Sequence, residues 1–114
     1  MQEYPVPLLN ELQYTYLGST FDIESRFDQA LIAGNLKKIV KCVQEFGYQP
    51  NLHHLRQAFR LGNLSIINYL STRINLDDYL KYFSKRNHNA LKNELVYLYS
   101  QSFINKDQYF TYYT

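Results

Sequence analysis

The chain has 114 residues, and its twelve Lys and Arg against ten Asp and Glu give a formal net charge of only +2. This length is typical of one domain that folds without a metal, and a single cysteine, Cys42, excludes an internal disulfide. No stretch approaches the roughly 18 apolar residues of a membrane span, and residues 1–5 lack the features of a signal peptide. We therefore expect one cytoplasmic domain over residues 1–114 and no membrane contact.

The first segment, residues 1–21, is predicted to be a lead-in and N-terminal cap. Pro5 and Pro7 disfavour a regular helix at the start of the chain. Apolar residues then follow at helical spacing until Gly18, which predicts a short helix. They are Leu8, Leu9, Leu12, Tyr16 and Leu17.

Residues 22–47 are predicted to form the first helical hairpin. Phe27, Ala30 and Leu31 share one face of a helix over about 22–33, which Gly34 ends. The partner helix ends at Gly47, and its apolar face comprises Leu36, Ile39, Val40, Val43 and Phe46. Cys42 falls within this apolar pattern, so we expect a buried thiol.

An internal repeat predicts the second hairpin, residues 48–75. The stretch Ala30–Leu36, with its Gly34-Asn35 turn, returns at 58–64 with Gly62-Asn63 at the turn, a constant offset of 28 in residue number. A third, degenerate hairpin is predicted over 76–101, because Leu91, Leu95 and Leu98 repeat the spacing of Leu36, Val40 and Val43 at an offset of 55. Asn75, Asp77 or Asp78 is expected to cap its first helix, in which Tyr79, Leu80, Tyr82 and Phe83 face inward, and a polar break is expected over 84–89.

The C-terminal tail, residues 102–114, contains four aromatic residues among its last six positions: Tyr109, Phe110, Tyr112 and Tyr113. Aromatic side chains at this density are expected to be covered. Two interpretations remain open. The tail either folds back over the last hairpin as a cap, or it docks on another chain as a homo-oligomer contact or an assembly segment.

The two copies of Ala-x-x-x-Gly-Asn-Leu, each followed by Ile/Val and Leu, resemble the helix-turn-helix core of ankyrin repeats. The resemblance is to divergent units of the kind found in many viral proteins. The offset is shorter than the usual unit of about 33 residues, and the usual Thr-Pro-Leu-His start is absent. The resemblance implies an all-α, ankyrin-like α-solenoid of about three units with terminal caps. A generic α-hairpin solenoid or a compact helical bundle is the alternative.

The resemblance further implies a protein-binding module that meets its partner, another protein, on the inner helices and the loops between units. The polar or aromatic residues that the core pattern leaves over in this region are Tyr48, Gln49, His53, Arg56, Arg60 and Arg73. If the protein is viral, we expect it to act in the host cytoplasm or nucleus. The alternative function is that of a structural subunit in a larger assembly such as a virus particle.

Catalysis finds no support in the sequence. His53 and His54 would point about 100° apart on a helix, so they are not expected to bind one metal together, and no cofactor motif or nucleophile motif is present. Asp77 and Asp78 precede an apolar helix and are interpreted as N-terminal caps. Lys37, Lys38, Lys41, Arg56 and Arg60 raise the alternative of nucleic-acid binding, which the small net charge disfavours.

Overall fold

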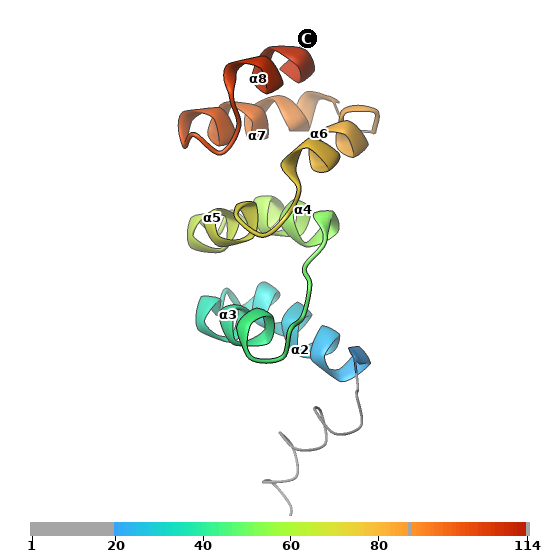
Figure 1. Ribbon diagram of the computed structural model, residues 1–114, viewed down its shortest axis with the longest axis vertical. Helices are drawn as coiled ribbons and strands as arrows, with labels where there is room; N and C mark the ends of the chain where they lie inside the picture. The colour runs from blue at the N-terminus through green and yellow to red at the C-terminus, as the bar shows by residue number, and fades with distance from the viewer. Residues whose placement is uncertain (1–19, 87, 114) are drawn as a thin grey trace, which may run out of the picture. The chain divides into compact units, whose positions relative to one another are not determined.

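The computed structural model describes residues 20–86 and 88–113, and within these ranges all regular structure is helical (Figure 1). Seven helices and no strands occur there, which confirms the predicted all-α class. None of these helices is both long and apolar enough to cross a bilayer. The predicted helix of the lead-in, before Gly18, lies outside the described residues. The chain divides into two compact units, unit 1 up to Gln49 and unit 2 from Pro50 onward.

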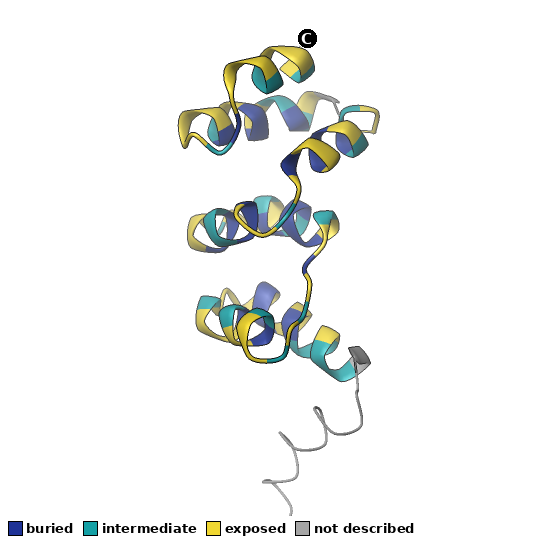
Figure 2. Ribbon diagram, viewed as in Figure 1, coloured by how far each residue is buried: buried dark blue, intermediate teal, exposed yellow. Residues whose placement is uncertain are grey.

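Unit 1 contains an antiparallel helix pair, α2 (Thr20–Ala33) and α3 (Leu36–Gln44). The two helices are joined at Gly34, whose φ of 73° is readily adopted only by glycine, and Asn35 caps α3. The predicted boundary at Gly34 is therefore confirmed, and so is the burial of Cys42, which is a free thiol. The buried apolar residues of this unit are Phe27, Ala30, Leu31, Ile39 and Cys42 (Figure 2).

Unit 2 contains five helices in its described part: α4 (Leu52–Leu61), α5 (Leu64–Ser71), α6 (Leu76–Ser84), α7 (His88–Ser100) and α8 (Lys106–Tyr113). Helix α4 packs against α5 and α6, and α6 packs against α7 and α8. Leu91, Leu95 and Leu98 of α7 are fully buried, as the sequence pattern predicts. Leu55, Ile66, Leu70, Tyr79 and Leu80 complete the centre of this core.

Asparagine caps the N-terminus of five of the described helices. The side-chain Oδ1 of Asn35 accepts from the N–H of Lys38, and that of Asn63 accepts from the N–H of Ile66, both at 3.1 Å. These two asparagines stand 28 residues apart, and each follows a glycine with φ 73°. Asn51, Asn75 and Asn105 make the corresponding bonds at α4, α6 and α8. Each bond satisfies a backbone donor that the helix leaves unpaired.

Removal of one such cap is expected to lower stability modestly. Asn63→Ala deletes the acceptor for the Ile66 N–H and should reduce the free energy of unfolding by about 1 kcal/mol, measured by urea denaturation. Asn63→Asp retains the acceptor, so its free energy of unfolding should stay within a few tenths of a kcal/mol of the original value. An Asp variant as unstable as the Ala variant would show that the cap is not the cause.

Core positions recur at an offset of 28 in residue number through three helix pairs. Phe27, Leu55 and Phe83 form one such series, and Ile39, Ile67 and Leu95 form a second, all of them buried. Cys42, Leu70 and Leu98 form a third. The residues that define the offset of 55 in the first hairpin, Leu36, Val40 and Val43, are only half-buried. The buried residues of α3 are Ile39 and Cys42.

The structure shows four details of the last third of the chain that the sequence left open or placed differently. Helix α7 begins at His88, inside the expected polar break, and Tyr82 is half-buried where the pattern predicts an inward-facing residue. Asn75, and neither Asp77 nor Asp78, is the N-cap of α6; the two carboxylates lie in its first turn, where the helix dipole favours them. The tail forms a helix, α8, which packs on α7 and α6.

Candidate functional site

A pocket of about 380 Å³ lies between α4 and the C-terminal end of α6 in unit 2. Cationic side chains from α4 and from the turn that follows α6 line it, and no acidic side chain is among its described lining residues. We call it the cationic pocket, and it is lined by His53, Arg56, Gln57, Arg60, Phe83 and Arg86.

Aromatic rings hold the cations of this pocket in place. The Arg86 guanidinium lies 3.8 Å from the centre of the Tyr82 ring, and its Nη1 donates to the Tyr82 carbonyl at 3.1 Å. His53 meets Tyr82 and Phe83 edge-on, at 5.4 and 5.8 Å between ring centres. Cation–π contacts and edge-on ring pairs of this kind restrict side chains that would otherwise move freely. The cationic pocket is thus partly ordered before any ligand arrives.

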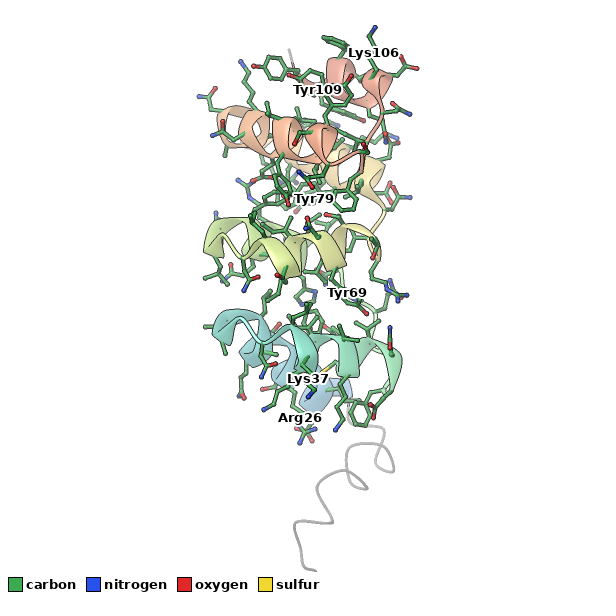
Figure 3. All side chains as sticks on the ribbon, turned by 90° about the vertical axis from the view of Figure 1, so that its left-hand side faces the viewer. Arg26, Lys37, Tyr69, Tyr79, Lys106 and Tyr109 are labelled. Carbon is green, nitrogen blue, oxygen red and sulfur yellow. The ribbon has the colours of Figure 1, made fainter. Side chains whose placement is uncertain are left out.

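Arg56 lines the cationic pocket, and its guanidinium forms an ion pair with a carboxylate inside unit 2. Its Nη1 donates to Oε2 of Glu94 on α7, and the Tyr79 hydroxyl of α6 donates to Oε1 of the same carboxylate. Arg56 and Glu94 are each 8 % exposed, and Tyr79 is fully buried. Figure 3 shows Tyr79 among the side chains packed inside unit 2. Three helices are therefore joined by one buried ionic network.

Burial has the largest effect on the pKa values of Glu94 and Tyr79 in this network. Removal from water raises the pKa of Glu94 above its ordinary value, although the hydrogen bond from Tyr79 and the charges of Arg56 and Arg60 oppose the rise. Burial, followed by the neighbouring Glu94 carboxylate, also raises the pKa of the Tyr79 hydroxyl. The network therefore carries a desolvation cost that its internal hydrogen bonds offset only in part.

The structure brings three of the six predicted partner-binding residues together, namely His53, Arg56 and Arg60. The core pattern leaves Arg56 over, but the structure buries its guanidinium against Glu94. Replacing Arg56 by Glu would place two carboxylates together in the interior, so that variant is not a clean test of binding. Arg60 is exposed and lines the cationic pocket as a surface cation.

The other three predicted residues lie outside the cationic pocket. Arg73 follows α5, with its guanidinium 5.4 Å from the centre of the Tyr69 ring. Tyr48 and Gln49 belong to unit 1, where Tyr48 is half-buried and packs on Phe27 at 4.8 Å between ring centres. Tyr48 thus contributes to the packing of unit 1.

The Tyr48 hydroxyl is expected to make unit 1 sensitive to alkali. Burial, together with the Glu24 and Asp28 carboxylates, raises its pKa to about 12 from the ordinary 10.0. The folded chain then retains a proton that the unfolded chain releases, so stability should fall as the pH rises from 10 to 12. Urea unfolding at pH 9 and pH 11 should show a smaller loss for Tyr48→Phe than for the original chain. An identical loss in both would contradict this assignment.

Sequence reasoning missed Gln57, Phe83 and Arg86 as members of the cationic pocket. The sequence pattern presents Arg86 only as part of a polar break and Phe83 only as a core residue. The one sequence signal was that Phe83 stands 28 residues after Leu55, which marks it as a corresponding buried position on a later helix. Glu94 gave no such signal, because an acidic residue between Leu91 and Leu95 looks like any solvated helix position.

Unit 1 has a larger pocket, of about 600 Å³, between α2 and α3. Its lining includes Asp22 together with Arg26, Lys38 and Lys41, so a carboxylate stands among the cations that line this pocket, whereas none lines the cationic pocket. Lys37, another cation considered for nucleic acid, does not line it. In the described ranges, no group of three or more His, Cys, Asp or Glu residues is placed to hold a metal ion.

The aromatic tail residues cluster on α8 and the adjoining face of α7. Tyr109, which is labelled in Figure 3, stacks on Tyr99 at 4.7 Å between ring centres, and its ring centre lies 5.0 Å from that of Tyr113. Ile104, just before α8, is buried, whereas Phe110 is 55 % exposed and Tyr112 is half-buried. The tail therefore folds back on unit 2, as one of the two open interpretations expects, and it also leaves aromatic surface uncovered.

Comparison of the chain with protein-family models, with curated proteins and with solved structures finds no match.

Proposed function

We propose that this chain is a non-catalytic interaction module, built from three degenerate ankyrin-like helical units, that binds an acidic segment of a partner protein at the cationic pocket. The observation that carries the proposal is the convergence of Arg56, Arg60 and Arg86 on one pocket, while the acid paired with Arg56, Glu94, lies buried behind it. Three guanidinium groups against this one carboxylate leave two positive charges facing solvent. A carboxylate-bearing ligand would neutralise them through charge-assisted hydrogen bonds.

The repeat interpretation is supported by two correspondences between the units. The Gly-Asn turn after α2 and the one after α4 share the same φ at glycine and the same cap at asparagine. The three buried series that start at Phe27, Ile39 and Cys42 extend the same period into α6 and α7. Arrays of such units present extended surfaces that commonly serve to bind other proteins.

The proposal is tested by selecting random peptides of twelve residues against the full chain on phage. We expect the selected peptides to be enriched in Asp and Glu. Their affinities, measured by fluorescence anisotropy, should fall at least about tenfold in Arg60→Glu/Arg86→Glu, because the introduced carboxylates would face those of the peptide and like charges placed together at an interface are strongly unfavourable. Both residues are exposed, so circular dichroism should show an unchanged helical content.

A matched charge reversal serves as the control. Lys81→Glu/Lys106→Glu changes the net charge of unit 2 by the same amount at exposed positions that do not line the cationic pocket. This variant should retain affinity to within a factor of two or so, since long-range effects of exposed charges are screened by salt. Equal losses in the two variants, or selected peptides without acidic enrichment, would refute the proposal.

A second candidate function, a subunit of a larger assembly such as a virus particle, is favoured by exposed apolar surface on α7 and α8. Val96, Tyr99, Phe110 and Tyr113 are between 36 % and 55 % exposed. Large exposed rings on adjoining helices are typical of contact surfaces. Size-exclusion chromatography with light scattering tests this candidate: a concentration-dependent oligomer that Phe110→Ser abolishes would support it, and a monomer at all concentrations would reject self-assembly.

A further inference from the structure

We infer that the partner segment carries an apolar side chain close to its acidic residue, and that this side chain enters a second pocket beside the cationic pocket. The inference rests on the proposed function and makes its ligand more specific. A pocket of about 470 Å³ lies between α4, the start of α5 and α7, and it shares Arg56 and Arg60 with the cationic pocket. The two pockets therefore adjoin along α4.

The second pocket differs from the first in its chemistry. Apart from the shared arginines, its described lining carries no cation, and much of its wall is apolar. We call it the apolar pocket, and its apolar lining residues are Phe59, Leu64, Ile67, Ala90 and the ring of Tyr97. Leu64 is 57 % exposed, so an apolar surface is open to solvent there. Covering this surface would stabilise a complex.

Two of the polar side chains that line the apolar pocket, Tyr97 and Glu94, are engaged within the protein, whereas Asn93 at its edge is exposed. The Tyr97 hydroxyl donates to Oδ1 of Asn68 at 2.6 Å, and the Glu94 carboxylate accepts from Arg56 and Tyr79. A ligand entering here gains little from additional hydrogen bonds to these groups, so apolar contact is the favoured source of affinity. Arg60, exposed at the border, is the residue placed to contact both parts of a ligand.

This arrangement fits a peptide better than a nucleic acid. A nucleic-acid strand carries one phosphate per nucleotide and binds along a continuous cationic track. The cations here end at Arg60, after which the groove becomes apolar. A peptide with an acidic residue and a neighbouring Leu, Ile or Phe matches the change in character along α4.

The test uses fluorescein-labelled peptides of twelve residues in a Gly/Ser background. One contains two adjacent Glu, one two adjacent Leu, and a third set contains Glu-Glu and Leu-Leu separated by zero to three residues. We expect the best member of the mixed set to bind the full chain about tenfold more tightly than the Glu peptide, from burial of its apolar side chains. The Leu peptide should bind more weakly than either.

The chain offers a matched pair of variants. Leu61 and Leu64 flank the Gly62-Asn63 turn and are both exposed, but only Leu64 lines the apolar pocket. Leu64→Ser should remove most of the advantage of the mixed peptide over the Glu peptide, whereas Leu61→Ser should preserve it. Neither change should alter binding of the Glu peptide by more than about twofold.

Two failures are distinguishable. If the Glu peptide binds as tightly as every mixed peptide, or if Leu61→Ser and Leu64→Ser act alike, the inference of an apolar anchor is overturned while the acidic-ligand proposal stands. If no Glu-containing peptide binds, both fail. Tighter binding of a fluorescein-labelled twelve-nucleotide single strand of dT than of any peptide would also overturn both, in favour of nucleic-acid recognition.

Discussion

Replacing Glu94 by Ala should destabilise unit 2 by about 3 to 5 kcal/mol, because it leaves the Arg56 guanidinium buried without its counter-ion. The Tyr79 hydroxyl loses its acceptor in the same change. A loss of this size is a large part of the stability of a domain. Urea denaturation followed by circular dichroism provides the measurement.

Two further variants separate charge from packing in this network. Glu94→Gln retains an acceptor for Tyr79 but not the charge, so it should lose less stability than Glu94→Ala. Arg56→Met/Glu94→Leu removes both buried charges and should recover much of the loss, as replacement of buried ion pairs by apolar residues often does. The exposed Glu45→Ala should change stability by less than about 0.5 kcal/mol. A Glu94→Ala loss as small as that of Glu45→Ala would contradict the account.

Truncating the chain after Gln101 should lower the free energy of unfolding by about 3 kcal/mol, from the loss of buried Ile104 and of the ring stack between Tyr99 and Tyr109. Helix α8 covers parts of α7 and α6, so its removal exposes their apolar residues to water. Thermal and urea unfolding measure the change.

The exposed ring of Phe110 provides the control for the truncation. Phe110→Ser removes an aromatic side chain that is 55 % exposed, so it should alter stability far less than the truncation does. Light scattering on all three chains distinguishes a cap from a docking segment. A truncated chain of unchanged stability that has lost self-association would show that the tail functions between chains and that its packing on α7 is incidental.

The helical class and most helix boundaries could be predicted because they depend on local chemistry. The turns after Ala33 and after Leu61 each contain a glycine followed by an asparagine. The glycine adopts the positive φ that ends one helix, and the asparagine side chain accepts a backbone hydrogen bond that begins the next. The helix of the tail could not be predicted in the same way, because the aromatic side chains of Tyr109, Phe110, Tyr112 and Tyr113 together spread over about 160° of a helix and define no narrow apolar face. Their helix is specified by packing against α7 and by the Asn105 cap.

The candidate site could be predicted only in part. His53 and Arg60 stand out because the core pattern leaves them over, and the same reasoning singled out Arg56. The burial of Arg56 could not be predicted, because its counter-ion is Glu94, 38 residues away along the chain, and a buried ion pair at this separation leaves no local pattern. Arg86 joins the pocket through the packing of α6 on α4, which is also non-local.

A reciprocal charge exchange tests the central claim most directly. An acidic peptide selected by the original chain and its counterpart with Lys in place of each acidic residue are titrated, by fluorescence anisotropy, into the original chain and into Arg60→Glu/Arg86→Glu. We predict that the original chain binds only the acidic peptide and that the variant binds the Lys peptide more tightly than the acidic one. Failure of the variant to reverse this preference, with its fold intact, would contradict the claim that the cationic pocket recognises the partner.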